Sequence, residues 1–133
     1  MTKQPYSVSV RSLLAFTVVL LLALFPVGWL GEIWLPANLL ASWLFDSVEA
    51  HAVGHTLVFL VVGGTALTVF PPLASKPGRY LAIMLLMGVA QECFQLLYKQ
   101  RPIAFDDVRD LGPDMLGAVV ALVVVRTRML FYA

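Results

Sequence analysis

The chain has 133 residues, of which 60% are hydrophobic and 13% are charged, and its mean hydropathy is +0.87. Soluble domains carry about 25% charged residues, so this composition excludes an ordinary soluble domain and predicts a membrane protein. The net charge of +1 gives no field that would recruit nucleic acid. Cys93 is the single cysteine, which excludes an intrachain disulfide, and we interpret it as a small buried hydrophobic residue.

The first apolar run follows a short polar segment and predicts a membrane-spanning helix over residues 12–30. Lys3 and Arg11 precede this run, as basic residues precede the apolar part of a signal peptide. The run is too long for a signal peptide, and no A-x-A-like cleavage site follows it. We therefore expect this helix to be retained.

The segment over residues 31–45 is apolar but is interrupted by Glu32, Pro36 and Asn38. Together with Trp29 just before it, this region holds all three tryptophans of the chain. Tryptophan side chains concentrate at the headgroup level of a bilayer. We therefore expect a short interfacial segment that anchors the chain, in preference to a lid over a ligand.

A second membrane-spanning helix is predicted over residues 47–70. Asp46 and Glu49 have the spacing of a capping box at its start, so that Asp46 would accept from the free N–H groups of the first turn. Pro71 and Pro72 would end the helix, because proline cannot continue the hydrogen-bond ladder.

Two more membrane-spanning helices are predicted over residues 80–98 and 113–131, separated by a polar loop over residues 99–112. Pro113 fits the first position of the last helix, where its missing N–H costs nothing. The expected fold is therefore all-α: residues 1–133 form a single polytopic membrane domain, a four-helix bundle.

The placement of basic residues predicts the orientation of this bundle, because short cytoplasmic segments carry an excess of lysine and arginine. Six basic residues fall on one side of the layout, namely Lys3, Arg11, Lys76, Arg79, Arg126 and Arg128, and three on the other, namely Lys99, Arg101 and Arg109. We therefore expect both termini in the cytoplasm. The acids at the starts of the second and fourth helices then lie near the extracytoplasmic side.

Polar residues with helical spacing mark the candidate site. Spacings of three and four place Glu92 and Gln95 on one face of the third helix, and Asp110 and Asp114 on one face at the start of the fourth. We expect these faces to meet inside the bundle, with two histidines and an arginine as available partners. The candidate polar network is His51, His55, Glu92, Gln95, Arg101, Asp110 and Asp114, and the candidate packing glycines are Gly63, Gly64, Gly88 and Gly117.

A purely structural role for these groups is an equal alternative, because carboxylates also cap helices and polar side chains tie membrane helices together. Histidines four residues apart can share a metal ion, but no H-E-x-x-H pattern is present, so neither a metal nor a cofactor is predicted. Acid–base catalysis would need a poised pair such as Glu92 with His55. The chain lacks a clear nucleophile or metal set, so an enzyme is not the favoured interpretation.

At these positions the chain resembles the VanZ-like family of small bacterial membrane proteins. The family pattern has a His-x-x-x-aromatic element near the start of the second helix, Glu-x-x-Gln on the third, and an Arg followed by Asp-x-x-x-Asn-x-x-Gly at the fourth. The matching residues here are His55 with Phe59, Glu92 with Gln95, Arg101, and Asp110 with Asp114 and Gly117, which cover about half of the chain. Asp114 stands where the family usually has asparagine, and the loop from Arg101 to Asp110 is longer than in the family.

The resemblance implies a multi-pass protein of the bacterial cytoplasmic membrane, in a family named from a member associated with resistance to the glycopeptide teicoplanin. It implies no established reaction. Our own expectation is a polar pocket that opens outward and binds or shields an outer-leaflet lipid or a lipid-linked cell-wall component. The alternative is a small structural subunit of a larger respiratory or photosynthetic membrane complex. Partners under these interpretations are membrane lipids, an envelope component or other membrane proteins, and no nucleic acid.

Overall fold

The computed structural model describes residues 8–25, 33–36, 38–39, 42 and 47–131, and the regular structure in this part of the chain is helical. The long helices are α1 (Val10–Leu24), α4 (Val48–Val69), α5 (Pro77–Lys99) and α6 (Phe105–Phe131), and a short 3-10 helix, η1 (Pro71–Leu73), joins α4 to α5. The predicted all-α class is confirmed for these residues.

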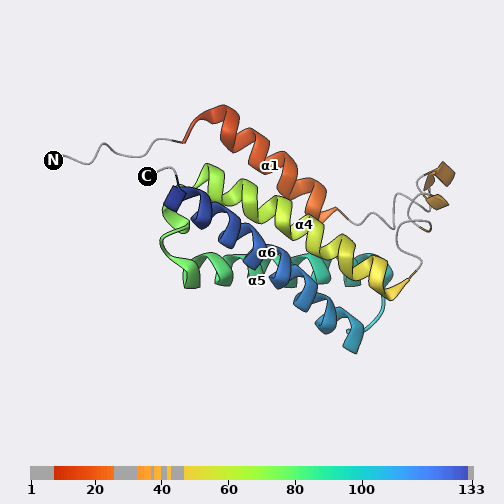
Figure 1. Cartoon of the computed structure of the whole chain (residues 1–133). Helices are drawn as coiled ribbons and strands as arrows, with labels where there is room; N and C mark the ends of the chain where they lie inside the picture. Colours follow the sequence, from red (N-terminus) through yellow and green to blue (C-terminus); the bar gives the residue numbers. More distant parts are fainter. Residues whose placement is uncertain (1–7, 26–32, 37, 40–41, 43–46, 132–133) are drawn as a thin grey trace.

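The four long helices lie side by side as a bundle (Figure 1). Helix α4 is central: it packs most extensively against α6 and also contacts α1, while α5 packs against α6. Helices α4 and α6 run in the same direction, and α1 and α5 run in the opposite direction (Figure 1). The start of α1 and the end of α6 therefore lie at the same end of the bundle.

Helix α1 is a peripheral helix, since none of its side chains is fully buried. The Ser9 hydroxyl begins it by accepting a hydrogen bond from the Ser12 N–H at 3.1 Å, which satisfies one of the free donors of the first turn. Phe16 contacts Phe70 edge-on, with ring centroids 5.7 Å apart, and so ties α1 to the end of α4. The helix is predicted to continue to residue 30 but ends at Leu24, and residues 26–30 lie outside the described part.

Helix α4 begins one residue later than the capping-box spacing predicts. Its N-cap is Ser47, whose hydroxyl accepts a hydrogen bond from the Ala50 N–H at 3.0 Å, and Asp46 lies outside the described residues. Serine caps a helix as well as aspartate does, so the prediction chose the wrong one of two neighbouring cap residues. The end of the helix agrees with the prediction, because α4 ends at Val69 and Pro71 follows its C-cap residue Phe70.

Helix α6 begins at Phe105, well before the predicted start at residue 113, so the prediction that Pro113 occupies the first helical position is wrong. Asp106 and Asp107 lie in the first turn, where negative charge complements the helix dipole. Pro113 lies inside the helix, where it has no N–H to donate, and the chain is helical on both sides of it. Asp110 therefore projects from a helix and not from a loop.

Glycine permits the close approach of α4 and α6. A Cβ atom at Gly117 would overlap the carbonyl oxygen of Thr56 and lie 2.9 Å from the Leu60 nitrogen, so only glycine fits between these backbones. A Cβ at Gly63 would overlap the hydroxyl of the buried Tyr80. A Cβ at Gly64 would have no neighbour within 4 Å among the described residues, so this part of the chain shows no helix packed against Gly64.

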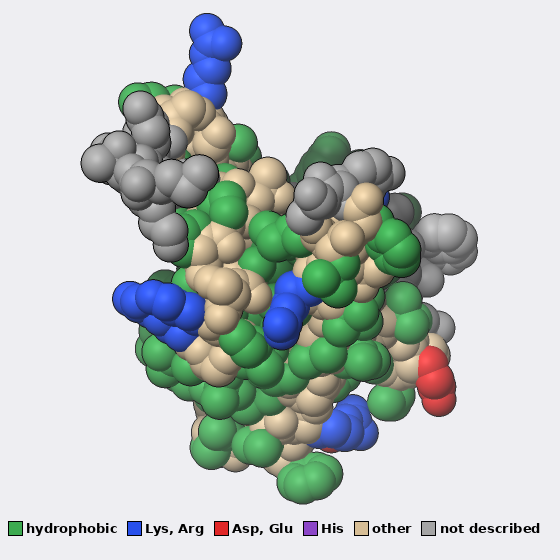
Figure 2. Space-filling view, turned by 60° about the vertical axis from the view of Figure 1, so that its left-hand side comes forward, with side chains coloured by type: hydrophobic (Ala, Val, Ile, Leu, Met, Phe, Trp, Pro, Cys, Tyr) green, Lys and Arg blue, Asp and Glu red, His purple; other side chains and the backbone are tan. Residues whose placement is uncertain are grey.

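Apolar side chains cover much of the outside of the bundle. Exposed examples on the three longest helices are Val53, Leu57, Val61, Leu85, Leu86, Leu97, Leu116, Val119 and Val123. Figure 2 shows one such face, on which hydrophobic side chains dominate and basic side chains are set among them. Helices α4 and α5 are long and apolar enough to cross a membrane, and α1 is a shorter apolar helix. Cys93 is exposed on α5, contrary to the buried position predicted for it.

About half of the segment predicted to lie in the membrane interface, residues 31–45, falls outside the described residues. The part that is described consists of residues 33–36, 38–39 and 42, all of which are exposed. The large apolar side chains among them are Ile33, Trp34, Leu35 and Leu39.

Candidate functional site

Two histidines on α4 pair with two aspartates on α6. His51 Nε2 lies 3.1 Å from Asp110 Oδ2, and His55 Nδ1 lies 2.8 Å from Asp114 Oδ1. Both pairs join residues 59 apart in sequence, and each histidine and each aspartate is one helical turn from the next. Because α4 and α6 run in the same direction, equal spacings on the two helices produce a ladder of two rungs.

The two rungs differ in depth. The side chains of His51 and Asp110 are 39% and 12% exposed, whereas those of His55 and Asp114 are 6% and 1% exposed. His55 also stands between the two acids, since its Nε2 lies 4.0 Å from Asp110 Oδ2. The ladder therefore leads from the half-exposed imidazole of His51 to a carboxylate that is almost completely buried.

A third carboxylate, Glu92, reaches the ladder from α5. Glu92 is buried, and one atom each from His55, Glu92 and Asp114 lie within 4.8 Å of one another. A Cβ at Gly88, one turn before Glu92, would lie 3.0 Å from Asp114 Oδ2, so glycine leaves room for that oxygen. We call His51, His55, Glu92, Asp110 and Asp114 the polar cluster; it stands where α4, α5 and α6 meet.

Two carboxylate oxygens of the polar cluster lack a hydrogen-bond partner within the described part of the chain. They are Glu92 Oε1 and Asp114 Oδ2, and both are fully buried. A buried polar atom without a partner costs about 1–3 kcal/mol, and more when it is charged. Such atoms mark a place where a ligand, an ion or a proton would satisfy the group.

Two members of the predicted network lie outside this cluster. The Gln95 side-chain oxygen accepts a hydrogen bond from Lys99 Nζ at 3.0 Å on the exposed last turns of α5. Gln91, which was not predicted, is the buried glutamine of that helix. Arg101 does not pair with the acids of the cluster but binds Asp107 through both of its terminal nitrogens, at 2.8 and 2.5 Å. The structure therefore gives Gln95 and Arg101 direct partners outside the cluster.

Asp107 is the charged residue that the sequence analysis missed. Its carboxylate accepts from Arg101 and, at 2.7 Å, from the N–H of Ala104, the residue before α6. An acid that reaches back three residues to the start of its own helix forms half of a capping box, and this spacing was a usable signal. The hydrogen bond from Arg101 is the main reason that the pKa of Asp107 is below its ordinary value.

We expect Asp107→Asn to lower the free energy of unfolding by about 1 kcal/mol at neutral pH, because it weakens the helix start and the Arg101 pair. A carboxyl whose pKa is lowered on folding stabilises the folded state above its unfolded pKa of about 3.9, and this stabilisation is lost as the pH falls through the folded value. Denaturation in detergent at pH 7 and pH 3 measures both effects. The matched control is Asp106→Asn. Asp106 is an exposed acid 3.5 Å from Arg109, so its substitution should change the free energy of unfolding by less than about 0.5 kcal/mol. Equal effects of the two substitutions would contradict the capping role.

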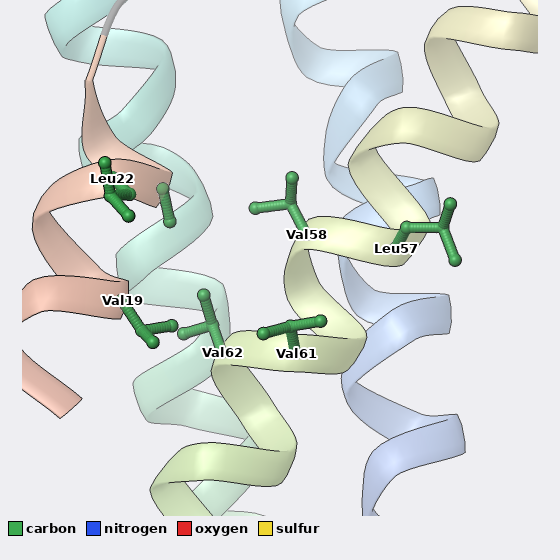
Figure 3. A pocket seen from close by; sticks show the side chains of 7 residues that line it. Val19, Leu22, Leu57, Val58, Val61 and Val62 are labelled. Carbon is green, nitrogen blue, oxygen red and sulfur yellow. The ribbon is translucent and has the colours of Figure 1, made fainter. Parts of the chain in front are cut away.

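A separate apolar groove runs between α1 and α4. It has a volume of about 340 Å³ and is lined by Val19, Leu22, Ala23, Leu57, Val58, Val61 and Val62 (Figure 3). Its lining offers hydrocarbon contacts and no charged group. The polar cluster lies on the α5 and α6 side of α4, so the groove is not part of it.

Comparisons of the chain with known protein families, with curated proteins and with solved structures found no match. What the site can bind therefore follows from the positions and charges of its own residues. Three carboxylates face two imidazoles, so a full set of ionised acids exceeds the available positive charge even when both histidines are protonated. The arrangement is suited to binding a cationic group.

Proposed function

We propose that this chain is a VanZ-like integral membrane protein whose polar cluster binds the head group of an outer-leaflet lipid or of a lipid-linked cell-wall component. The observation that carries this proposal is the polar cluster itself, in which three acids and two histidines from three helices converge inside a bundle with an apolar exterior. Ionisable groups in such surroundings are costly to retain, and in membrane proteins they commonly mark binding or transport sites.

The distribution of side chains supports placement in a bilayer. Leucine and valine side chains cover much of the outside of the bundle, while the acids of the polar cluster and His55 are buried beside an apolar core, whereas a soluble bundle turns its charged side chains outward. The basic residues Arg11, Arg79 and Arg128 lie at the end of the bundle that holds the start of α1 and the end of α6. Under the positive-inside rule this end is cytoplasmic, so the polar cluster belongs to the outer half of the bilayer.

Charge selects the kind of head group. The exposed rung, His51 with Asp110, is the part of the cluster that a ligand would meet first. An ammonium group would supply the missing positive charge and donate hydrogen bonds to carboxylate oxygens. Phosphatidylethanolamine and amine-bearing cell-wall precursors carry such a group, whereas phosphatidylglycerol carries only negative charge. A link to glycopeptide resistance is part of this proposal, because both concern lipid-linked envelope components.

Lipid binding tests the proposal directly. We expect the purified protein in mild detergent to retain phosphatidylethanolamine in native mass spectrometry and to unfold at a higher temperature when that lipid is added, with a smaller effect of phosphatidylglycerol. Asp110→Asn should weaken the preference for the amine lipid by about tenfold, because it removes the negative charge of the exposed rung. Asp106→Asn is the matched control. Equal responses to the two lipids, or an unchanged preference in Asp110→Asn, would overturn the proposal.

A role as a structural subunit of a larger membrane complex is the second candidate. The observation that favours it is the row of exposed valines on α6, namely Val119, Val120, Val123 and Val124, which could contact another protein in place of lipid. Extraction in gentle detergent followed by sizing separates the two candidates. A protein that co-purifies at fixed stoichiometry supports the subunit, and an isolated bundle supports the lipid-binding protein.

A further inference from the structure

We propose that the buried end of the polar cluster is a binding site for a divalent transition-metal cation, such as Zn²⁺ or Mn²⁺, with His55, Glu92 and Asp114 as its ligands. This inference departs from the sequence analysis, which predicted no metal. It does not depend on the proposed binding of a lipid head group, since the site stands on the positions of three side chains alone.

The three side chains converge from three different helices. His55 projects from α4, Glu92 from α5 and Asp114 from α6, and one atom of each lies within 4.8 Å of the others. Ligand atoms around a tetrahedral Zn²⁺ with bonds of about 2.0–2.2 Å are roughly 3.3–3.6 Å apart, so the widest separation must shorten by up to about 1.5 Å, and the 2.8 Å separation of His55 Nδ1 and Asp114 Oδ1 must widen. Side-chain rotation is sufficient for a change of this size.

Burial and the missing partners point to a ligand at this end of the cluster. His55, Glu92 and Asp114 are 6%, 6% and 1% exposed, so each is more than nine-tenths buried. The two carboxylate oxygens without a hydrogen-bond partner in the described chain, Glu92 Oε1 and Asp114 Oδ2, belong to two of these three residues. The outer rung differs in this respect, because His51 and Asp110 already bond to each other.

Charge balance supports the same assignment. If both carboxylates are ionised beside a neutral imidazole, they carry two negative charges, which are costly in an apolar interior unless a proton or a cation compensates them. A divalent cation neutralises both at once. The metal would take the place of the proton between His55 Nδ1 and Asp114 Oδ1, which lie 2.8 Å apart, so Nδ1 would be the ligating nitrogen, and Asp114 Oδ2 has no partner in the described chain.

The donor set indicates the class of metal. One imidazole nitrogen and two carboxylate oxygens suit Zn²⁺, Mn²⁺ or Fe²⁺, whereas Ca²⁺ takes six to eight oxygen ligands. Three protein ligands leave one coordination position for water or for an oxygen of a bound molecule. Gly88 provides space beside Asp114 Oδ2, since even a methyl group there would approach that oxygen to 3.0 Å.

Metal binding by the full-length protein in detergent tests this proposal. We expect the protein, once stripped with a chelator and shown by circular dichroism to remain helical, to bind one equivalent of Zn²⁺ in titration calorimetry. Co²⁺ should bind with the same stoichiometry and give the visible absorption of a low-symmetry site. The isosteric variants Glu92→Gln and Asp114→Asn should each weaken Zn²⁺ binding by at least about tenfold, and Asp106→Asn should leave it unchanged.

Two results would overturn the proposal. One is the absence of saturable binding of both Zn²⁺ and Mn²⁺ by the folded wild-type protein, a measurement that needs no variant. The other is binding that Glu92→Gln and Asp114→Asn do not weaken relative to Asp106→Asn. Because these measurements use no lipid, a failure here is distinct from a failure of the lipid-binding test.

Discussion

Replacing Gly117 with alanine is expected to lower the free energy of unfolding by about 3 kcal/mol, because the new methyl group would overlap the Thr56 carbonyl oxygen. The obstacle is backbone, which cannot rotate away as a side chain can, so α4 and α6 must separate. That separation would also lengthen the two histidine–aspartate pairs that join these helices. Denaturation in detergent, followed by helical circular dichroism, measures the effect.

Gly64→Ala is the matched control for Gly117→Ala. Gly64 lies on the same helix as Thr56 but has open space at its Cβ position. Alanine is the better helix former by about 1 kcal/mol, so this substitution should leave stability unchanged or raise it slightly. If the two substitutions had equal effects, the close contact of α4 with α6 at Gly117 would not be the cause.

Removal of the buried histidine is expected to have a similarly large effect. His55→Ala should lower the free energy of unfolding by about 3 kcal/mol, because it leaves Asp114 buried without its partner. His51→Ala should cost less than about 1 kcal/mol, since its imidazole is half-exposed and water can replace it at Asp110. The same unfolding measurement compares the two variants. A larger loss from His51→Ala would contradict the assigned depths of the two rungs.

The helical character of the chain and the meeting of its polar faces could be predicted from the sequence. Apolar runs set the helices, and spacings of three and four identified His51, His55, Glu92, Asp110 and Asp114, the residues that the structure brings together. These signals are local or repeat regularly along one helix. They depend little on how the helices pack.

The partners of Arg101, Gln95 and the α4 glycines could not be predicted, because several residues near each of them in sequence or along the helix were equally suitable partners. Arg101 had several acids within reach in sequence, and the turn before α6 places Asp107 closest. Gln95 lies on the same face of α5 as Glu92, but Lys99, one turn further on, binds its side-chain oxygen. The difference between Gly63 and Gly64 depends on where Tyr80 stands, which no spacing within α4 reveals.

The parallel ladder between α4 and α6 has a consequence for the sliding of one helix along the other. Because histidines and aspartates repeat at the same interval, a shift of one turn would still pair one histidine with one aspartate, and His55 is already 4.0 Å from Asp110. The same shift would bring Pro113 or Ala121 to the position of Gly117 against Thr56. Their side chains would collide with that backbone. The histidine–aspartate pairs thus permit three alignments of α4 and α6, namely the observed one and a shift of one turn in either direction. Only the observed alignment places Gly117 against Thr56, so this glycine selects it.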